Sequence, residues 1–218
     1  NKFTPGDVNA IVDDEYVNMF DRDLEGKAFI FKADTKEVEH EMVHMMYVDD
    51  GTGSMEVYRA DLDVLPEDLD VGDSAVFKAV YSPYGDLPET KNYSVSVCKK
   101  LNTPVTPREP LVLSADKRDP IVLKDNPARL VHVEEGIVQS HTVTNKPTSY
   151  TIDGSELDTK IHDLVLHFGE DTTDYTLSVD ERYWTLAREQ VGDLKPGDTI
   201  SCDAFISKNN TLVLTPPA

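Results

Sequence analysis

One short string in this sequence matches a catalytic pattern. Residues 40–44 have the form His-Glu-x-x-His, which on a helix places two histidines one turn apart as zinc ligands, with the glutamate as general base. On a β-strand the same spacing places His40 and His44 on one face and turns Glu41 to the other. The turn signal at residues 49–51 would soon end a helix, and no third ligand follows at a recognisable spacing. We therefore predict a strand that binds no metal. Soft-metal binding by the face that His40 and His44 share with Met42 and Met46 is one alternative, and a zinc hydrolase is the remote one.

A second group of side chains has the chemistry of ligand binding. Five aromatic or basic residues lie on or beside β-rich runs: Tyr58, Arg59, Lys78, Tyr81 and Tyr84. Tyrosine rings can stack on nucleic-acid bases, and basic side chains can neutralise phosphates. A tyrosine on a strand equally fits a core position, with its hydroxyl group reaching the surface. These five residues are our predicted ligand-binding residues.

The charge of the chain opposes a nucleic-acid ligand. The sequence has 41 acidic and 21 basic residues, which gives a formal net charge of −20. Such a charge repels a phosphate backbone unless basic side chains gather locally. Any binding to a single strand should therefore be weak.

Other signals for catalysis are missing from the sequence. It has no glycine-rich phosphate loop and no nucleophile elbow. Its two cysteines, Cys98 and Cys202, stand in alternating apolar runs, which predicts buried strand residues and not a disulfide framework or a metal site. We predict a non-catalytic protein without a cofactor.

The first half of the sequence predicts one helix followed by five strands. Apolar residues between Val8 and Phe20 recur at three- and four-residue spacing, as on an amphipathic helix, and Gly26 can close that helix. The pattern then changes to β-rich runs separated by turn residues. The expected strands are 28–33, 42–48, 55–58, 75–81 and 93–97. Glycines at residues 49–54 predict a hairpin between the second and the third.

A proline-rich stretch, residues 101–127, predicts a linker, because proline at this density forbids a continuous helix or a central strand. Its short apolar pieces, 111–113 and 121–123, could still pack against a barrel. After it the plan recurs, with a helix expected from Asp180 to Gln190. The expected strands are 130–138, 164–168, 175–179, 200–206 and 212–214.

Two family resemblances follow from particular motifs. Residues 47–58, together with Val71-Gly72-Asp73, resemble the hairpin between strands two and three and the start of strand four in OB domains of the replication protein A small subunit and of the anticodon-binding type. This resemblance implies an OB barrel and a single-stranded nucleic-acid ligand. Gly26-Lys27, following the predicted helix, is similar to the start of strand one in bacterial lipoprotein-type OB domains, which implies no particular ligand.

These patterns together predict a mostly β protein with two tandem five-stranded OB-like barrels. The expected divisions are an N-terminal helix packed on the first barrel (1–25), the first barrel (26–101), a linker (102–129) and a second barrel (130–218), with a helix between its third and fourth strands. The expected function is non-catalytic binding, as part of a single-stranded nucleic-acid assembly and partly through a protein partner. An extracytoplasmic binding module is the alternative, so intracellular and extracytoplasmic locations both stay open. No apolar run reaches the roughly 18 residues that cross a membrane.

Overall fold

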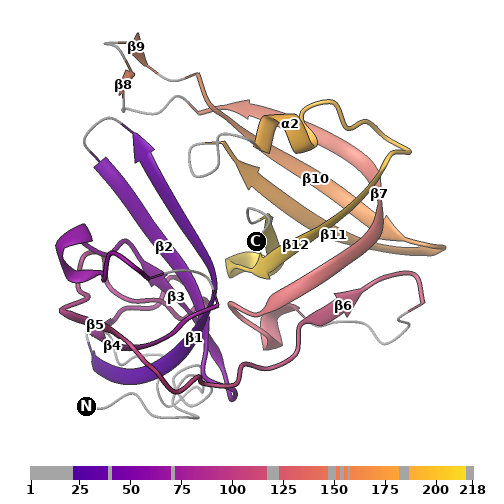
Figure 1. Ribbon diagram of the computed structural model, residues 1–218. Helices are drawn as coiled ribbons and strands as arrows, with labels where there is room; N and C mark the ends of the chain where they lie inside the picture. Colours follow the sequence, from indigo (N-terminus) through magenta and orange to yellow (C-terminus); the bar gives the residue numbers. More distant parts are fainter. Residues whose placement is uncertain are drawn as a thin grey trace.

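The computed structural model of the chain describes residues 22–38, 41–69, 72–116, 123–146, 151–152, 155–156, 158–181 and 187–214. The first group of strands is β1 (Arg22–Val38), β2 (Glu41–Asp49), β3 (Ser54–Tyr58), β4 (Ser74–Tyr81) and β5 (Val97–Lys100). The second is β6 (Leu111–Leu113), β7 (Leu130–Asn145), β10 (Lys160–Phe168), β11 (Asp171–Asp180), β12 (Thr199–Ile206) and β13 (Thr211–Leu214). The two groups lie beside one another (Figure 1).

Short elements complete the described chain. They are η1 (Leu62–Val64), η2 (Leu123–Asp125), the small hairpin of β8 (Thr151–Ile152) and β9 (Ser155–Glu156), α2 (Ala187–Val191) and η3 (Lys208–Asn210). Helical residues are thus few in the described ranges, and the protein is mostly β, as the sequence predicts.

The second group closes into a five-stranded barrel. β7 pairs with both β10 and β12, and β11 pairs with β13, so the order runs β7-β10-β11-β13-β12 and returns to β7. Antiparallel neighbours in the order β12-β7-β10-β11 form a Greek key. The last strand, β13, joins β12 antiparallel and β11 parallel. β6 pairs in parallel with the start of β7.

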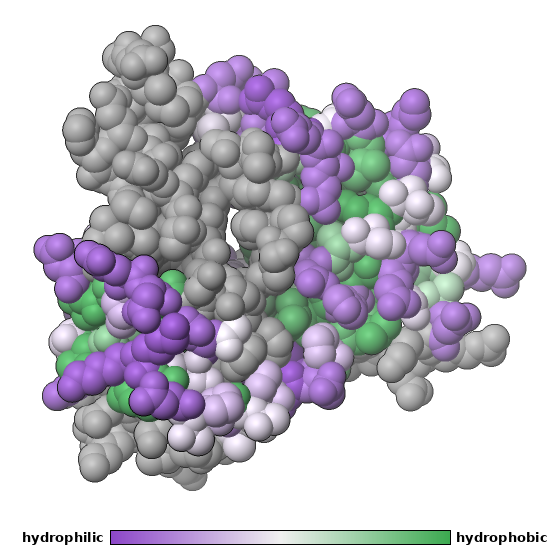
Figure 2. Space-filling model, in the orientation of Figure 1, coloured by the Kyte–Doolittle hydropathy of each residue, from purple (hydrophilic) through white to green (hydrophobic). Residues whose placement is uncertain are grey.

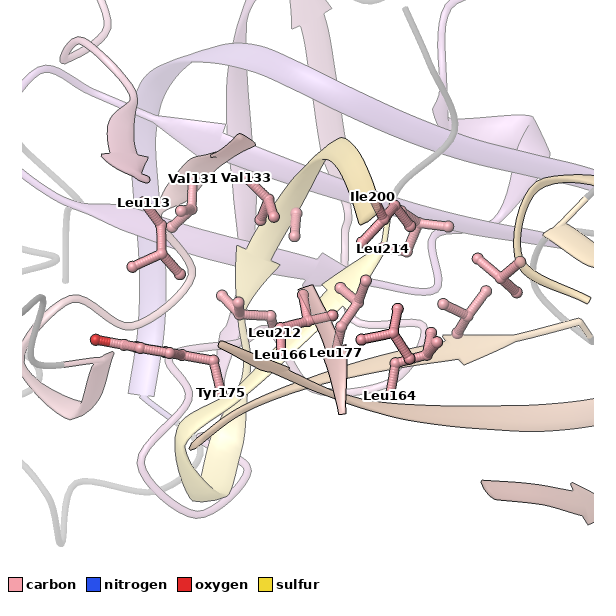
Figure 3. Packing of buried hydrophobic residues seen from close by; sticks show 14 of the residues in the cluster. Leu113, Val131, Val133, Leu164, Leu166, Tyr175, Leu177, Ile200, Leu212 and Leu214 are labelled. Atoms are coloured by element: carbon pink, nitrogen blue, oxygen red, sulfur yellow. The ribbon is translucent and has the colours of Figure 1, made fainter. Parts of the chain in front are cut away.

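Alternation along the strands builds the barrel core, because successive side chains of a strand point to opposite faces. Every second residue of β10 is buried, including Leu164 and Leu166, and β11 does the same with Leu177 and its neighbours. These side chains meet those of the other strands in one cluster (Figure 3). Leu113 of β6 belongs to it, so this apolar piece of the predicted linker does pack against a barrel. Each fully buried leucine contributes about 1.5–3 kcal/mol.

The first group has the same Greek-key order, β4-β1-β2-β3, with β5 at the outer edge of β4. No pairing between β3 and β5 is present among the described residues. Instead, the loop after β4 returns along β3: the amide of Glu56 donates to the carbonyl of Pro88 at 3.0 Å, and the amide of Thr90 donates to the carbonyl of Glu56 at 3.1 Å. Thr90 also bridges to Tyr81 of β4. Residues 87–90 therefore fill the gap between β3 and β4.

The turn between β2 and β3 is a hairpin, as predicted. Gly51 has a φ of +90°, and the Asp49 carboxylate accepts hydrogen bonds from the Ser54 hydroxyl at 2.8 Å and the Arg108 guanidinium at 3.1 Å. A Cβ atom on Gly51 would lie 2.8 Å from the carbonyl oxygen of Thr106. Both this close approach and the positive φ therefore require glycine. Arg108 comes from the predicted linker, which is thereby fastened to the first sheet.

Some predicted boundaries differ from the structure. The N-terminal helix prediction falls mainly on residues 1–21, outside the described residues, but Arg22–Gly26 belong to β1 and not to the end of a helix. The fifth strand was expected at residues 93–97 and lies at Val97–Lys100. The expectation was wrong because residues 91–93 form a turn, in which Tyr93 takes a φ of +55°.

The two remaining predictions concern a strand and a helix. His44 lies on β2, which begins at Glu41, whereas His40 lies outside the described residues. Asp180, the predicted N-cap, ends β11, and α2 begins only at Ala187; residues 182–186 between them are outside the described ranges. The division of the chain into four parts stays a prediction.

One face of the described surface is largely hydrophilic. On the face shown in Figure 2, hydrophilic residues cover much of the described part of both groups, with apolar patches between them. Within the described ranges, no helix has the length and apolar character needed to cross a membrane.

Candidate ligand-binding pocket

A pocket of about 390 Å³ lies where the two groups of strands meet. Its first wall comes from β2, β3 and the loop after β4, and its second wall from β11 and from residues around β13. The lining residues are Tyr47, Glu56, Tyr58, Tyr84, Leu87, Glu89, Ser178, Asp180, Ser207 and Val213. The volume is within the usual range of small-ligand sites.

The first wall is the outer face of β2 and β3. Met55 and Val57 of β3 point into the core of the first sheet, so Glu56 and Tyr58 point the opposite way, toward the pocket. Tyr47 stands directly opposite Glu56 on β2 and faces the same way. The sequence alternation therefore gives this outer face aromatic and acidic side chains.

An aromatic contact joins the two groups of strands at Tyr47, one of the lining residues. The ring of Tyr47 stacks on that of Phe205 in β12, with centroids 3.9 Å apart and planes 6° from parallel. Leu87, Ala128 and Leu130 pack around this pair as a small apolar cluster. Tyr47 and Phe205 are 7% and 1% exposed, so the contact between the two groups of strands is shielded from solvent at this point.

Two carboxyl groups meet in the pocket wall. The pKa of Glu56 is raised from 4.5 to about 8. Burial is the main cause, and the negative charge of Glu89 is the second. Burial also raises the pKa of Glu89, to about 7, while its hydrogen bond with Glu56 acts to lower it. Both effects place the shared proton on Glu56, which donates to the carboxylate of Glu89. Near neutral pH the pair therefore holds about one proton.

A basic side chain borders the same pocket. The ammonium group of Lys208, in η3, lies 3.6 Å from the centroid of the Tyr84 ring, a cation–π contact. The charge of Lys208 also acts to lower the pKa of Glu89. Tyr84 is 52% exposed, so the pocket opens to solvent at this ring.

The structure separates the five predicted binding residues. Tyr58 and Tyr84 line the pocket, and the Arg59 guanidinium lies 5.0 Å from the Tyr58 ring centroid. Tyr81 is buried in the core of the first sheet at 2% exposure, and Lys78 is exposed on β4. The binding role of all five stays a prediction.

Of the ten lining residues, the sequence prediction included Tyr58 and Tyr84 and missed the other eight, among them Tyr47, Glu56 and Glu89. An acidic residue between two apolar ones on a strand indicates a solvated outer face, so Glu56 gave no signal of burial. The loop after β4 runs along Glu56 through backbone hydrogen bonds to Pro88 and Thr90, and such contacts leave no pattern in the sequence of β3.

A second polar cluster lies at one end of the closed barrel. His162 donates or accepts through both ring nitrogens, to Glu181 at 2.5 Å and to His141 at 2.8 Å. Arg188 of α2 contacts the other oxygen of Glu181 at 2.8 Å. Burial raises the pKa of Glu181, but the hydrogen bonds with His162 and Arg188 outweigh burial and hold it below its usual value. The cluster ties α2 to the barrel.

Two further kinds of chemistry, metal ligation and thiol reactivity, depend on side chains in the described ranges. They contain no group of three histidine, cysteine or acidic residues placed to hold a metal ion. Cys98 is buried in β5, as predicted, and Cys202 is partly buried in β12. Burial raises the pKa of the Cys98 thiol to about 11 and that of Cys202 to about 12, so both stay protonated at neutral pH.

The chain resembles several solved structures, whereas the sequence comparisons find no match. No family model matches the chain. No curated protein sequence matches it either. Among solved structures, it is similar to a chain from a structure of a replication protein A heterotrimer bound to ssDNA, with 12% identity and a TM-score of 0.35. The match covers 90% of this chain and 50% of that one, so the chain spans about half the length of its structural neighbour.

Proposed function

We propose that this chain is a non-catalytic binding protein of two tandem OB-type barrels, and that its ligand binds in the pocket between them. One observation carries the proposal: the first wall of the pocket consists of β2, β3 and the loop between β4 and β5. In OB barrels the face of strands two and three, with the loop between strands four and five, is the ligand-binding surface.

A protein partner fits this site better than a free nucleic acid. Glu56, Glu89 and Asp180 all line the pocket, and the whole chain has a charge of −20. A phosphate brought to this wall would meet these carboxyl groups, whose repulsion the neighbouring Arg59 and Lys208 would offset only in part. A side chain from a protein can enter the pocket without bringing a negative backbone.

Single-stranded nucleic acid is the second candidate, because two rings at the site each have a cation beside them. Arg59 contacts the ring of Tyr58, and Lys208 contacts that of Tyr84. Rings and cations in this proximity can stack a base and neutralise its phosphate. We expect such binding to be weak and to release about one to three counterions.

The test is a titration followed by NMR, with a basic peptide, its acetylated neutral form and a labelled single strand as the three ligands. Binding in the pocket predicts shifts at Tyr84 and Leu87, and loss of the interaction in Tyr84→Ala. Tyr93→Ala is the matched control, since Tyr93 is another exposed tyrosine, 46% exposed, that does not line the pocket. Equal loss of ligand binding in Tyr84→Ala and Tyr93→Ala would contradict the proposal. So would the absence of chemical-shift changes with all three ligands.

A further inference from the structure

The pocket has the chemistry of a cation site. Three of its lining residues are acidic and three are tyrosines, and none of the described lining residues is basic. Carboxylates attract a cation by charge, and a tyrosine ring attracts it through its negative face. Glu56 is 5% exposed, so its interaction with a charge in the pocket is screened by water far less than that of a surface glutamate.

The protein already holds an ammonium group at the edge of this pocket. The contact of Lys208 with the Tyr84 ring, at 3.6 Å, is the geometry that an incoming ammonium group would adopt on a tyrosine. The positive charge of Lys208 also acts on Glu89, whose pKa it lowers. The surroundings of Tyr84 and Glu89 thus favour a positive charge in this structure.

We propose that the pocket binds the ammonium group of a lysine side chain presented by a partner protein, against the rings of Tyr58 and Tyr84 and the carboxyl groups of Glu56 and Glu89. This inference rests on the proposed function, because it names the ligand class of the same site. The ligand keeps its own charge, and the proton between Glu56 and Glu89 leaves for solvent as the ammonium takes its place. Binding therefore releases about one proton near neutral pH.

The experiment is calorimetric titration with Nα-acetyl-lysine methylamide, in two buffers that differ in ionisation enthalpy, so that the difference in heat counts the protons released. The neutral comparison ligand is the same compound acetylated on its side-chain nitrogen. We expect heat from the cationic ligand alone, with proton release that falls as the pH rises above 8. Equal binding of the neutral ligand, or no proton release at pH 7, would overturn the proposal.

Variants assign the interaction to the pocket. Glu89→Gln should weaken binding by about tenfold, the loss expected for one charge-assisted contact. Glu134→Gln, an exposed position on β7, should change nothing, although it removes the same charge from the chain. Lys208→Met should strengthen binding about twofold or more, because it removes a competing cation beside Tyr84. Equal effects of Glu89→Gln and Glu134→Gln, or weaker binding in Lys208→Met, would contradict the assignment.

A further arm uses n-butylammonium, which carries the same charge without a peptide. Tighter binding of the lysine compound supports a protein as the source of the cation, and equal or tighter binding of butylammonium overturns it. Failure of the inference is distinguishable from failure of the proposed function. A single strand or the neutral ligand that shifts Tyr84 and Leu87 while the cations do not would leave the pocket as a binding site with another ligand class. No response to any ligand would contradict both the lysine-binding inference and the proposed function.

Discussion

The carboxyl pair in the pocket makes stability depend on pH in an unusual direction. A buried acid whose pKa is raised in the folded state binds its proton more tightly when folded than when unfolded. Glu56 therefore contributes stability that is fully present below pH 4.5 and is lost as the pH rises through about 8. Glu56→Gln removes the titration and keeps a neutral donor facing Glu89.

The size of the effect follows from the pKa of Glu56. Since one pKa unit is worth about 1.4 kcal/mol, the rise from 4.5 to about 8 corresponds to several kcal/mol of unfolding free energy. The wild type should lose up to this amount of unfolding free energy between pH 4 and pH 9. Glu89 is only partly buried, so its own contribution is smaller.

The measurement is urea denaturation of the wild type, Glu56→Gln and Glu134→Gln at half-unit steps from pH 5 to pH 9. Near pH 5 the three proteins should have similar stability. At pH 9 Glu56→Gln should be more stable than the wild type by several kcal/mol, whereas Glu134→Gln should follow the wild type, since Glu134 is exposed. If Glu56→Gln has the wild-type slope, or is the least stable protein at pH 9, the reasoning about the buried pair is refuted.

Three more outcomes test other parts of the structure. Arg108→Met should lower the unfolding free energy by about 3 kcal/mol, measured by urea denaturation, because Asp49 is 1% exposed and would lose its cation. Phe205→Ala should cost about 3–5 kcal/mol through the cavity left beside Tyr47, and should split one calorimetric transition into two; an unchanged single transition would contradict the role of the stack. Cys98 should react with a thiol reagent only in denaturant at pH 7, and rapid labelling of the native protein would show that its thiol is not buried.

The strands of the closed barrel could be predicted from the sequence, because their alternation is strong. Leu164, Leu166 and Leu177 occupy every second position in runs bounded by turn residues, and a period of two admits only a strand. The hairpin at Gly51 could be predicted for an equally local reason, since its positive φ needs glycine.

The closure of the first sheet could not be predicted in this way. Residues 87–90 fill the gap beside β3 through backbone hydrogen bonds, which leave no periodic pattern in the side chains. The true position of β5 was missed for the same reason, because the tyrosine-rich segment before it has the composition of a strand but turns at Tyr93. The ion pair between Arg108 and Asp49 was missed because a proline-rich stretch indicates a linker and carries no signal of a distant ion pair.

The two faces of β3 differ in a way that supports the proposed binding role of the pocket. The inward face, with Met55 and Val57, is apolar and contributes to folding. The outward face is buried just as deeply at Glu56, yet it carries an acid whose desolvation costs free energy that an apolar residue would not. A seam selected only for stability would extend the apolar cluster of Tyr47 and Phe205 across this position. An acid whose ionisation lowers stability as the pH rises, placed on the wall of a pocket, is the pattern we expect if the pocket binds a ligand as proposed.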